Sequence, residues 1–330
     1  MRTLVVTLFL WLGLTCAAQA QPVGWSDTQP IYIASQADAL PAGYQLRIEL
    51  DTAALIATGD LQADGGDLRF GATPSGATFL DYFIASGINT ATTVVFVRTP
   101  AVPANSLGMI YMFYGNPAAA DASTATTFDY VSLAENTTLG QGPRGAPSGS
   151  TNSQRGHRFI PTEDLLVTDL GGNVPTASTR PITLFDFDTQ TILRQESVAL
   201  PSGAYAYAPI DPILLEAGET YLLTVFNAAG QDDYWFGSTP VPVAEFGYQD
   251  MRYCNGCSAN TFPTSVLGGL YYGLPDFVFR TRVQLASPPT YSFAPPAVPL
   301  GRDLIMSMTL GLLLVGAGMA IRRRWTADTQ

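Results

Sequence analysis

The chain of 330 residues contains no lysine and one histidine, His157, and all 16 of its basic residues are arginine. Without lysine, neither Schiff-base chemistry nor a phosphate-binding loop ending in Gly-Lys is available. A nucleophile-histidine-acid triad would depend entirely on His157, which stands between Gly156 and Arg158 where a strand is expected to begin. We therefore expect a structural or exposed histidine and no enzymatic activity.

Paired carboxylates are the remaining route to hydrolysis. Glycoside hydrolysis needs two carboxylates flanking one bond, and Glu49 and Asp51 would share one face of an expected strand. They begin an E-x-D-x-x-E pattern, but the sequence over residues 49–54 is ELDTAA and lacks its last glutamate. A solvated strand edge explains both residues, so a glycoside hydrolase is the least favoured function.

Charge is scarce and its balance is acidic. Only 13% of the residues are charged, and the net charge is −11 at pH 7. An acidic surface repels nucleic acid and anionic lipid, so nucleic acid is excluded as an expected partner.

Cysteine is also scarce, with three residues in the chain. Cys16 lies within an expected signal peptide, although it could instead be a lipoprotein cysteine. Cys254 and Cys257 form a C-N-G-C pattern, and a cysteine-based zinc site would need two more ligands. In an exported chain a disulfide is the favoured interpretation, whereas a thioredoxin-like redox pair would require this pattern to open a helix. Free thiols and adventitious metal binding are also open.

The two ends of the chain predict export and anchoring. Residues 1–20 combine a positive start, an apolar run and the small-residue pattern AQA, which predicts a signal peptide cleaved after Ala20. Residues 304–321 are 18 uncharged residues, long enough to cross a bilayer as a helix. The positive charge after them, which marks a cytoplasmic tail at 322–330, comes from Arg322, Arg323 and Arg324.

Between the two ends the pattern is that of strands. Short runs of β-branched and aromatic residues alternate with Gly, Pro, Asn and Asp, and only residues 52–57 suggest a short helical turn. We expect an all-β chain of two tandem, jelly-roll-like β-sandwich domains plus the C-terminal transmembrane helix. The expected divisions are a first sandwich at 21–136, a linker at 137–155, a second sandwich at 156–285 and a proline-rich spacer at 286–303.

Five sequence blocks occur in order at 30–33, 46–51, 64–70, 94–103 and 110–117, the last reading IYMFYGNP. Together they resemble a domain-of-unknown-function family of bacterial and archaeal surface proteins. The resemblance to this YGNP-type family implies an extracellular β-sandwich in the N-terminal half, with no established enzymatic activity. Residues 156–282 look like a second recurrent exported β-domain.

The C-terminal 33 residues resemble bacterial sorting signals of the IPTL-CTERM/PEP-CTERM type. The sequence VPL at 298–300 fills the short proline motif ahead of the apolar span and the arginine cluster. The resemblance implies a sorting protease as a partner.

Two ligand sites are further expectations. Asp60, Asp64 and Asp67 surround a Gly-Gly turn and could offer oxygen ligands to calcium, although turn residues bonding their own backbone are the simpler interpretation. Calcium is the one cofactor that the sequence suggests. Tyr234 and Trp235 could stack on sugar rings of a surface polysaccharide, although core packing is the commoner role of such residues.

Taken together, the sequence predicts a non-enzymatic envelope or surface protein. It would be exported, anchored in the membrane by the C-terminal helix and open to sorting to the cell surface or extracellular matrix. The alternative function is a carbohydrate-binding module of the surface or matrix.

Overall fold

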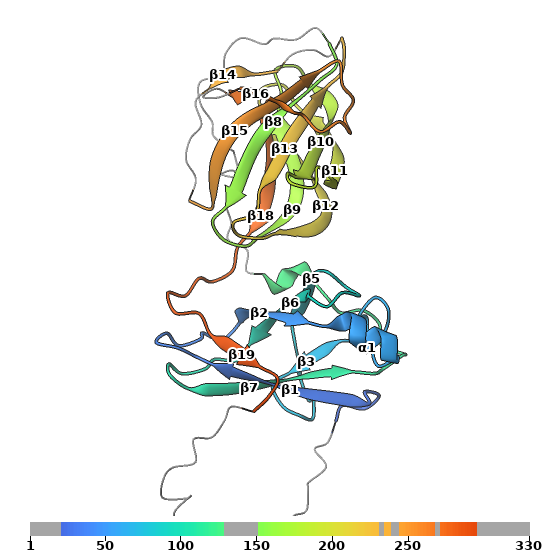
Figure 1. Ribbon diagram of the computed structural model, residues 1–330, viewed down its shortest axis with the longest axis vertical. Coiled ribbons are helices and arrows are strands. Elements are labelled where there is room, and N and C mark those ends of the chain that lie inside the picture. The colour runs from blue at the N-terminus through green and yellow to red at the C-terminus, as the bar shows by residue number, and fades with distance from the viewer. Residues whose placement is uncertain (1–20, 129–150, 231–233, 239–243, 268–270, 296–330) are drawn as a thin grey trace, which may run out of the picture. The chain divides into compact units, whose positions relative to one another are not determined.

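The computed structural model describes residues 21–128, 151–230, 234–238, 244–267 and 271–295, and it is an all-β structure (Figure 1). Within these ranges the helical elements are α1 (Thr52–Thr58) and a short 3-10 turn (Ala125–Thr127). The described residues as far as Tyr291 belong to one compact unit, and those after it to a second. The all-β expectation is confirmed.

Two sheets make up the N-terminal module. Their orders are β19-β1-β7-β3-β4 and β2-β6-β5. The strands are β1 (Asp27–Ala34), β2 (Tyr44–Leu50), β3 (Arg69–Gly71), β4 (Phe79–Leu80), β5 (Tyr82–Ser86), β6 (Thr93–Thr99), β7 (Leu107–Tyr114) and β19 (Thr290–Ser292).

The sequence of each strand explains its place in the N-terminal module. β2 buries Leu46, Ile48 and Leu50, while the alternating Arg47 and Glu49 point away from the core. The strand β6, with the sequence TVVFVRT, is buried on both faces because it is the middle strand of its sheet.

The C-terminal module also has two main sheets, ordered β11-β10-β13-β8-β15-β16 and β12-β9-β18, and a small pair β14-β17. The strands are β8 (Ser153–Pro161), β9 (Leu165–Asn173), β10 (Ser178–Asp186), β11 (Ile192–Leu200), β12 (Tyr205–Leu215), β13 (Tyr221–Asn227), β14 (Phe236–Ser238), β15 (Phe246–Asn255), β16 (Ser265–Leu267), β17 (Tyr271–Tyr272) and β18 (Pro275–Arg280).

One core joins the two main sheets of the C-terminal module. Phe159, Ile182 and Val225 come from the six-stranded sheet, and Val167 and Phe277 come from the three-stranded sheet. All five are almost completely buried. The module is therefore sandwich-like, with its apolar side chains alternating into the space between the sheets.

Two segments differ from the expected divisions of the chain. Thr290–Ser292, expected within the proline-rich spacer, forms β19 beside β1 in the N-terminal module. Ser153–Pro161 forms β8, so the C-terminal module begins before the expected end of the linker. Both strands gain backbone hydrogen bonds from neighbours far away in sequence, which local composition does not reveal.

The expected terminal segments lie outside the described residues, namely the signal peptide with Ala20, the span 304–321 and Arg322, Arg323 and Arg324. In the described part of the chain, no helix is both long and apolar enough to cross a membrane.

A close approach of two strands generates the first prediction. A Cβ atom added to Gly156 in β8 would lie 1.9 Å from the Leu223 carbonyl oxygen of the neighbouring β13. A Cβ added to Gly247 in β15 would have its nearest neighbour at 3.6 Å, in the side chain of Gln249. We expect Gly156→Ala to lower the free energy of unfolding by at least about 2 kcal/mol, because backbone must move.

The matched control is Gly247→Ala, which should change the free energy of unfolding by no more than about 0.5 kcal/mol. Urea titration followed by tryptophan fluorescence measures both variants. Equal stability of the two variants would contradict the strand pairing of β8 with β13.

Candidate functional site

Asp67 is the most densely bonded acidic residue of the N-terminal module. Its side chain is buried, and one carboxylate oxygen accepts a hydrogen bond from the backbone N–H of Gln62 at 2.9 Å. The other oxygen accepts from the N–H groups of Gly115 at 2.9 Å and Asn116 at 3.0 Å. Trp25 donates its indole N–H to the Asp67 carbonyl at 2.8 Å. Asp67 thus ties the Y-G-N-P turn after β7 to the loop before β3.

Gly115 is required at this turn. Its φ of +84° lies in the left-handed region, and a Cβ atom there would come 2.1 Å from the Ser26 hydroxyl oxygen. The glycine lets the backbone N–H groups of the turn reach Asp67. The Y-G-N-P residues that carry the sequence resemblance therefore form a turn whose backbone binds a carboxylate.

This arrangement bears on the calcium candidates. The Asp67 carboxylate faces N–H donors, which is the opposite of what a cation requires. Asp64 accepts from the N–H of Gly66, and Asp60 accepts from the hydroxyl of Thr58. In the described ranges, no group of three or more His, Cys, Asp or Glu side chains could hold a metal ion. The three aspartates are turn residues that bond their own backbone or neighbours.

The bonding of Asp67 generates a second prediction. In Asp67→Asn one carboxylate oxygen becomes an NH2 group that must face a backbone N–H, so a buried donor loses its acceptor. We expect the free energy of unfolding to fall by about 3 kcal/mol. The control Asp60→Asn changes an exposed side chain and should stay within about 0.5 kcal/mol of the wild type in the same denaturation. An Asp67→Asn variant with the same free energy of unfolding as the wild type would refute the structural role of Asp67.

His157 is fully buried on β8, with its ring centroid 5.9 Å from that of Tyr248. Burial lowers the pKa of His157 to about 3, only partly opposed by a backbone hydrogen bond at Gly273. The imidazole is neutral at every physiological pH and is shielded from solvent. It cannot act as a proton donor or acceptor for an outside substrate.

The lowered pKa of His157 generates a third prediction. Unfolded histidine has a pKa of about 6.5, so between pH 6.5 and about 3 the unfolded chain binds a proton that the folded chain does not. Stability is therefore lost as the pH falls through this window, by up to about 1.4 kcal/mol per pH unit. His157→Gln should show a shallower loss from pH 6.5 to 4.5 in urea titrations. Identical slopes would mean that His157 is protonated in the fold.

The two aromatic candidates for a glycan site lie in the C-terminal module, and both have structural partners. Tyr234 is 7% exposed, and the Arg155 guanidinium lies 4.1 Å from its ring centroid. Trp235 is half-buried and donates its indole N–H to Asn173 at 2.9 Å. Tyr234 is therefore a packed residue, whereas Trp235 is partly exposed.

The remaining candidate residues also have structural partners. Glu49 accepts a hydrogen bond from Arg47 at 2.5 Å, and Asp51 caps α1 by accepting from the N–H of Ala54 at 2.9 Å. Cys254 and Cys257 are joined by a disulfide, as predicted, at the end of β15. The carboxylates and cysteines that stand out in the sequence therefore bond within the protein.

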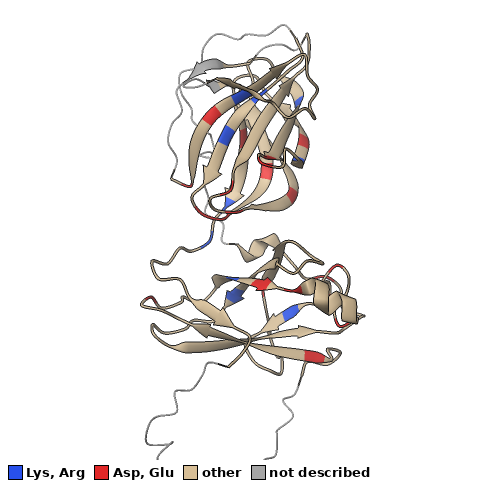
Figure 2. Cartoon of the chain, viewed as in Figure 1, with Lys and Arg blue, Asp and Glu red and all other residues tan. Residues whose placement is uncertain are grey.

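Polar contacts join the two modules in one compact unit. Arg47 on β2 bonds Glu216 at 3.1 Å and approaches Asp164 at 3.9 Å, and Arg282 bonds Asp164 at 3.2 Å. An apolar cluster combines residues of both modules, namely Val94, Phe96, Phe128, Leu166 and Leu214. Acidic residues are spread over strands and loops of both modules (Figure 2).

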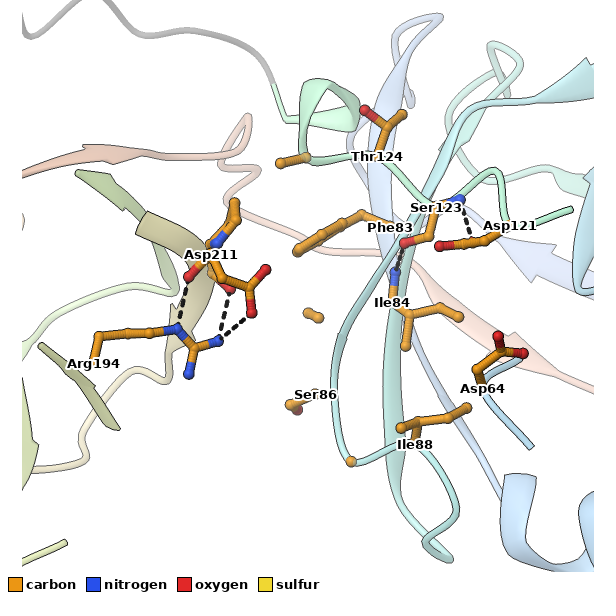
Figure 3. Close-up of a pocket in the computed structure, with 14 residues that line it drawn as sticks. Asp64, Phe83, Ile84, Ser86, Ile88, Asp121, Ser123, Thr124, Arg194 and Asp211 are labelled. Carbon is orange, nitrogen blue, oxygen red and sulfur yellow. Dashed lines mark hydrogen bonds and ion pairs between the residues drawn. The ribbon is translucent and has the colours of Figure 1, made fainter. Parts of the chain in front are cut away.

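A cavity of about 510 Å³ lies beside this apolar cluster (Figure 3). Apolar side chains of Phe83, Ile84 and Ile88 contribute to its wall. Its charged lining residues are Asp64, Asp121, Asp211 and Arg194. They come from segments far apart in sequence, so no local pattern could have brought them together.

A family model described as a domain of unknown function, DUF2341, matches residues 64–142. Over this stretch the chain resembles that family. The match includes the aspartate at 67 and the turn at 115–116, and it supports the expected resemblance to an uncharacterised domain family over these residues. No curated protein and no solved structure matches the chain.

Proposed function

We propose that this protein is a non-enzymatic, exported envelope protein whose two tandem jelly-roll-like sandwiches are presented outside the cytoplasm. The observation that supports it best is that the potentially reactive side chains are buried or bonded within the protein. His157 is neutral and buried, Asp67 is saturated by backbone N–H groups, and Glu49 is paired with Arg47. A scaffold with these roles fits binding or structural work better than catalysis.

Export is the second part of the proposal. A disulfide between Cys254 and Cys257 is the bond expected of a protein that folds in an oxidising compartment. The sequence of residues 1–20 supplies a signal-like start, and 304–321 followed by Arg322, Arg323 and Arg324 supplies an anchor-like end. The YGNP-type resemblance and the sorting-signal resemblance both point to surface delivery, with a sorting protease as a transient partner.

A carbohydrate-binding module is the second candidate, and a pair of tyrosines favours it. Tyr205 and Tyr207 on β12 stack with ring centroids 6.4 Å apart and an interplanar angle of 13°. Both are half-buried, and the Tyr207 hydroxyl donates to Asp276 at 2.8 Å. Partly exposed, nearly parallel rings offer an apolar face to a sugar.

The anchoring proposal generates a fourth prediction. Deleting residues 304–330 should move the protein from the membrane fraction to the soluble exported fraction, because the truncated chain loses the apolar, uncharged span 304–321 that is expected to cross the bilayer. Fractionation after a high-salt wash, with mass spectrometry of the N-terminus, measures the outcome. The control replaces Arg322, Arg323 and Arg324 by alanine and keeps the span, so it should stay in the membrane.

Four results would count against the proposal. A truncated chain that remains membrane-bound would remove the anchor. A mature protein that keeps Met1 would argue against export, and a lipid on Cys16 would replace the helix by a lipid anchor. Turnover of a polysaccharide that is lost in Glu49→Gln would favour the hydrolase.

A further inference from the structure

The cavity beside the apolar cluster has a defined chemistry. Arg194 and Asp211 form an ion pair at 3.0 Å, and Arg194 also donates to the backbone carbonyl of Asp211 at 2.7 Å (Figure 3). The pair neutralises itself, so the remaining charge of the lining comes from Asp64 and Asp121. An apolar wall with a net negative rim attracts a cation that also carries apolar groups.

The two rim carboxylates are held by their own turns. One oxygen of Asp64 accepts from the N–H of Gly66 at 2.9 Å, and one oxygen of Asp121 accepts from the N–H of Ser123 at 2.8 Å. Gly65 fits closely against the wall, since a Cβ there would lie 2.9 Å from Ile88 and 3.0 Å from Ile84. The negative charges are therefore fixed in position before any ligand arrives, which lowers the entropic cost of binding.

One wall of the cavity is an edge strand. β5 pairs with β6 on one side only. Along its other side, Thr124 donates to the carbonyl of Tyr82 at 2.9 Å, and the Ser123 hydroxyl accepts from the N–H of Ile84 at 2.9 Å. The register with β6 then shifts between Ile84 and Ser86. The strand then continues along the cavity through Ala85 and Ser86.

We propose that this cavity binds an extended peptide segment of a partner protein in which basic and apolar residues alternate. An extended chain presents successive side chains on opposite sides, so one set can rest on Ile84, Ile88 and Phe83 while basic side chains reach the rim. The main chain of the peptide lies along the edge of β5, as in strand addition. Basic side chains bond Asp64 and Asp121. This inference goes beyond the proposed function and does not rest on export or anchoring.

The test measures binding of a fluorescein-labelled peptide, Val-Lys-Val-Lys-Val-Lys, to the full-length protein by fluorescence anisotropy. The comparison peptide has glutamate in place of every lysine. The variant Asp64→Asn/Asp121→Asn keeps the oxygen that each turn needs but removes both charges. The matched control is Glu219→Gln, which removes an exposed charge from a residue that does not line the cavity. The blocking variant is Ser86→Arg, an exposed position on the cavity wall.

We expect the lysine peptide to bind the wild type and Glu219→Gln equally. It should bind the double aspartate variant about tenfold more weakly, which corresponds to about 1.4 kcal/mol. Binding should be lost in Ser86→Arg, should weaken at high salt and should be absent for the glutamate peptide.

Four different results overturn the proposal. If the lysine peptide does not bind the wild type, the proposed peptide site is refuted. Equal weakening by Glu219→Gln means that the peptide is attracted to the acidic chain as a whole, and unchanged binding in Ser86→Arg places the peptide elsewhere. A neutral polysaccharide whose binding is lost in Ser86→Arg but kept in the double aspartate variant assigns the cavity to a glycan instead.

Discussion

The N-terminal module depends on one buried carboxylate. Asp67 accepts three backbone N–H groups from two segments that are about fifty residues apart in the chain, and its carbonyl receives the indole of Trp25. A buried carboxylate is tolerated only when its oxygens are satisfied, and buried N–H groups need acceptors for the same reason. The bonds of Asp67 therefore fix the turn at 115–116, and with it the end of β7 against the loop before β3.

A second set of contacts links the two modules. Arg47 on β2 reaches Glu216 and Asp164, while apolar side chains from β6 and β9 share a cluster. The ion pairs are partly exposed and contribute little each, so burial of the cluster supplies most of the stabilisation. The cavity proposed to bind a basic peptide borders this cluster, and its lining is complete only when both modules contribute.

The residues that most resemble reactive groups in the sequence bond within the fold. The sequence correctly indicated that Cys254 and Cys257 pair, and it left open whether His157 is structural or exposed, whereas the structure buries it. It did not indicate that Asp67 differs from Asp60 and Asp64, because three aspartates around a Gly-Gly turn look alike until backbone donors surround one of them. It also missed the cavity, since Asp121 and Asp211 line the same space only through the tertiary arrangement.

The sequence alone determined the all-β fold class, because alternation of apolar side chains and turn residues is a local property that the backbone obeys. The alternation of apolar and charged side chains in β2 and the continuous apolar run of β6 are visible in the sequence. Only the tertiary structure decided that Thr290–Ser292 joins β1 and that β8 starts at Ser153. Strand partners and buried bonding depend on contacts between residues far apart in the chain, and a local pattern carries no information about them.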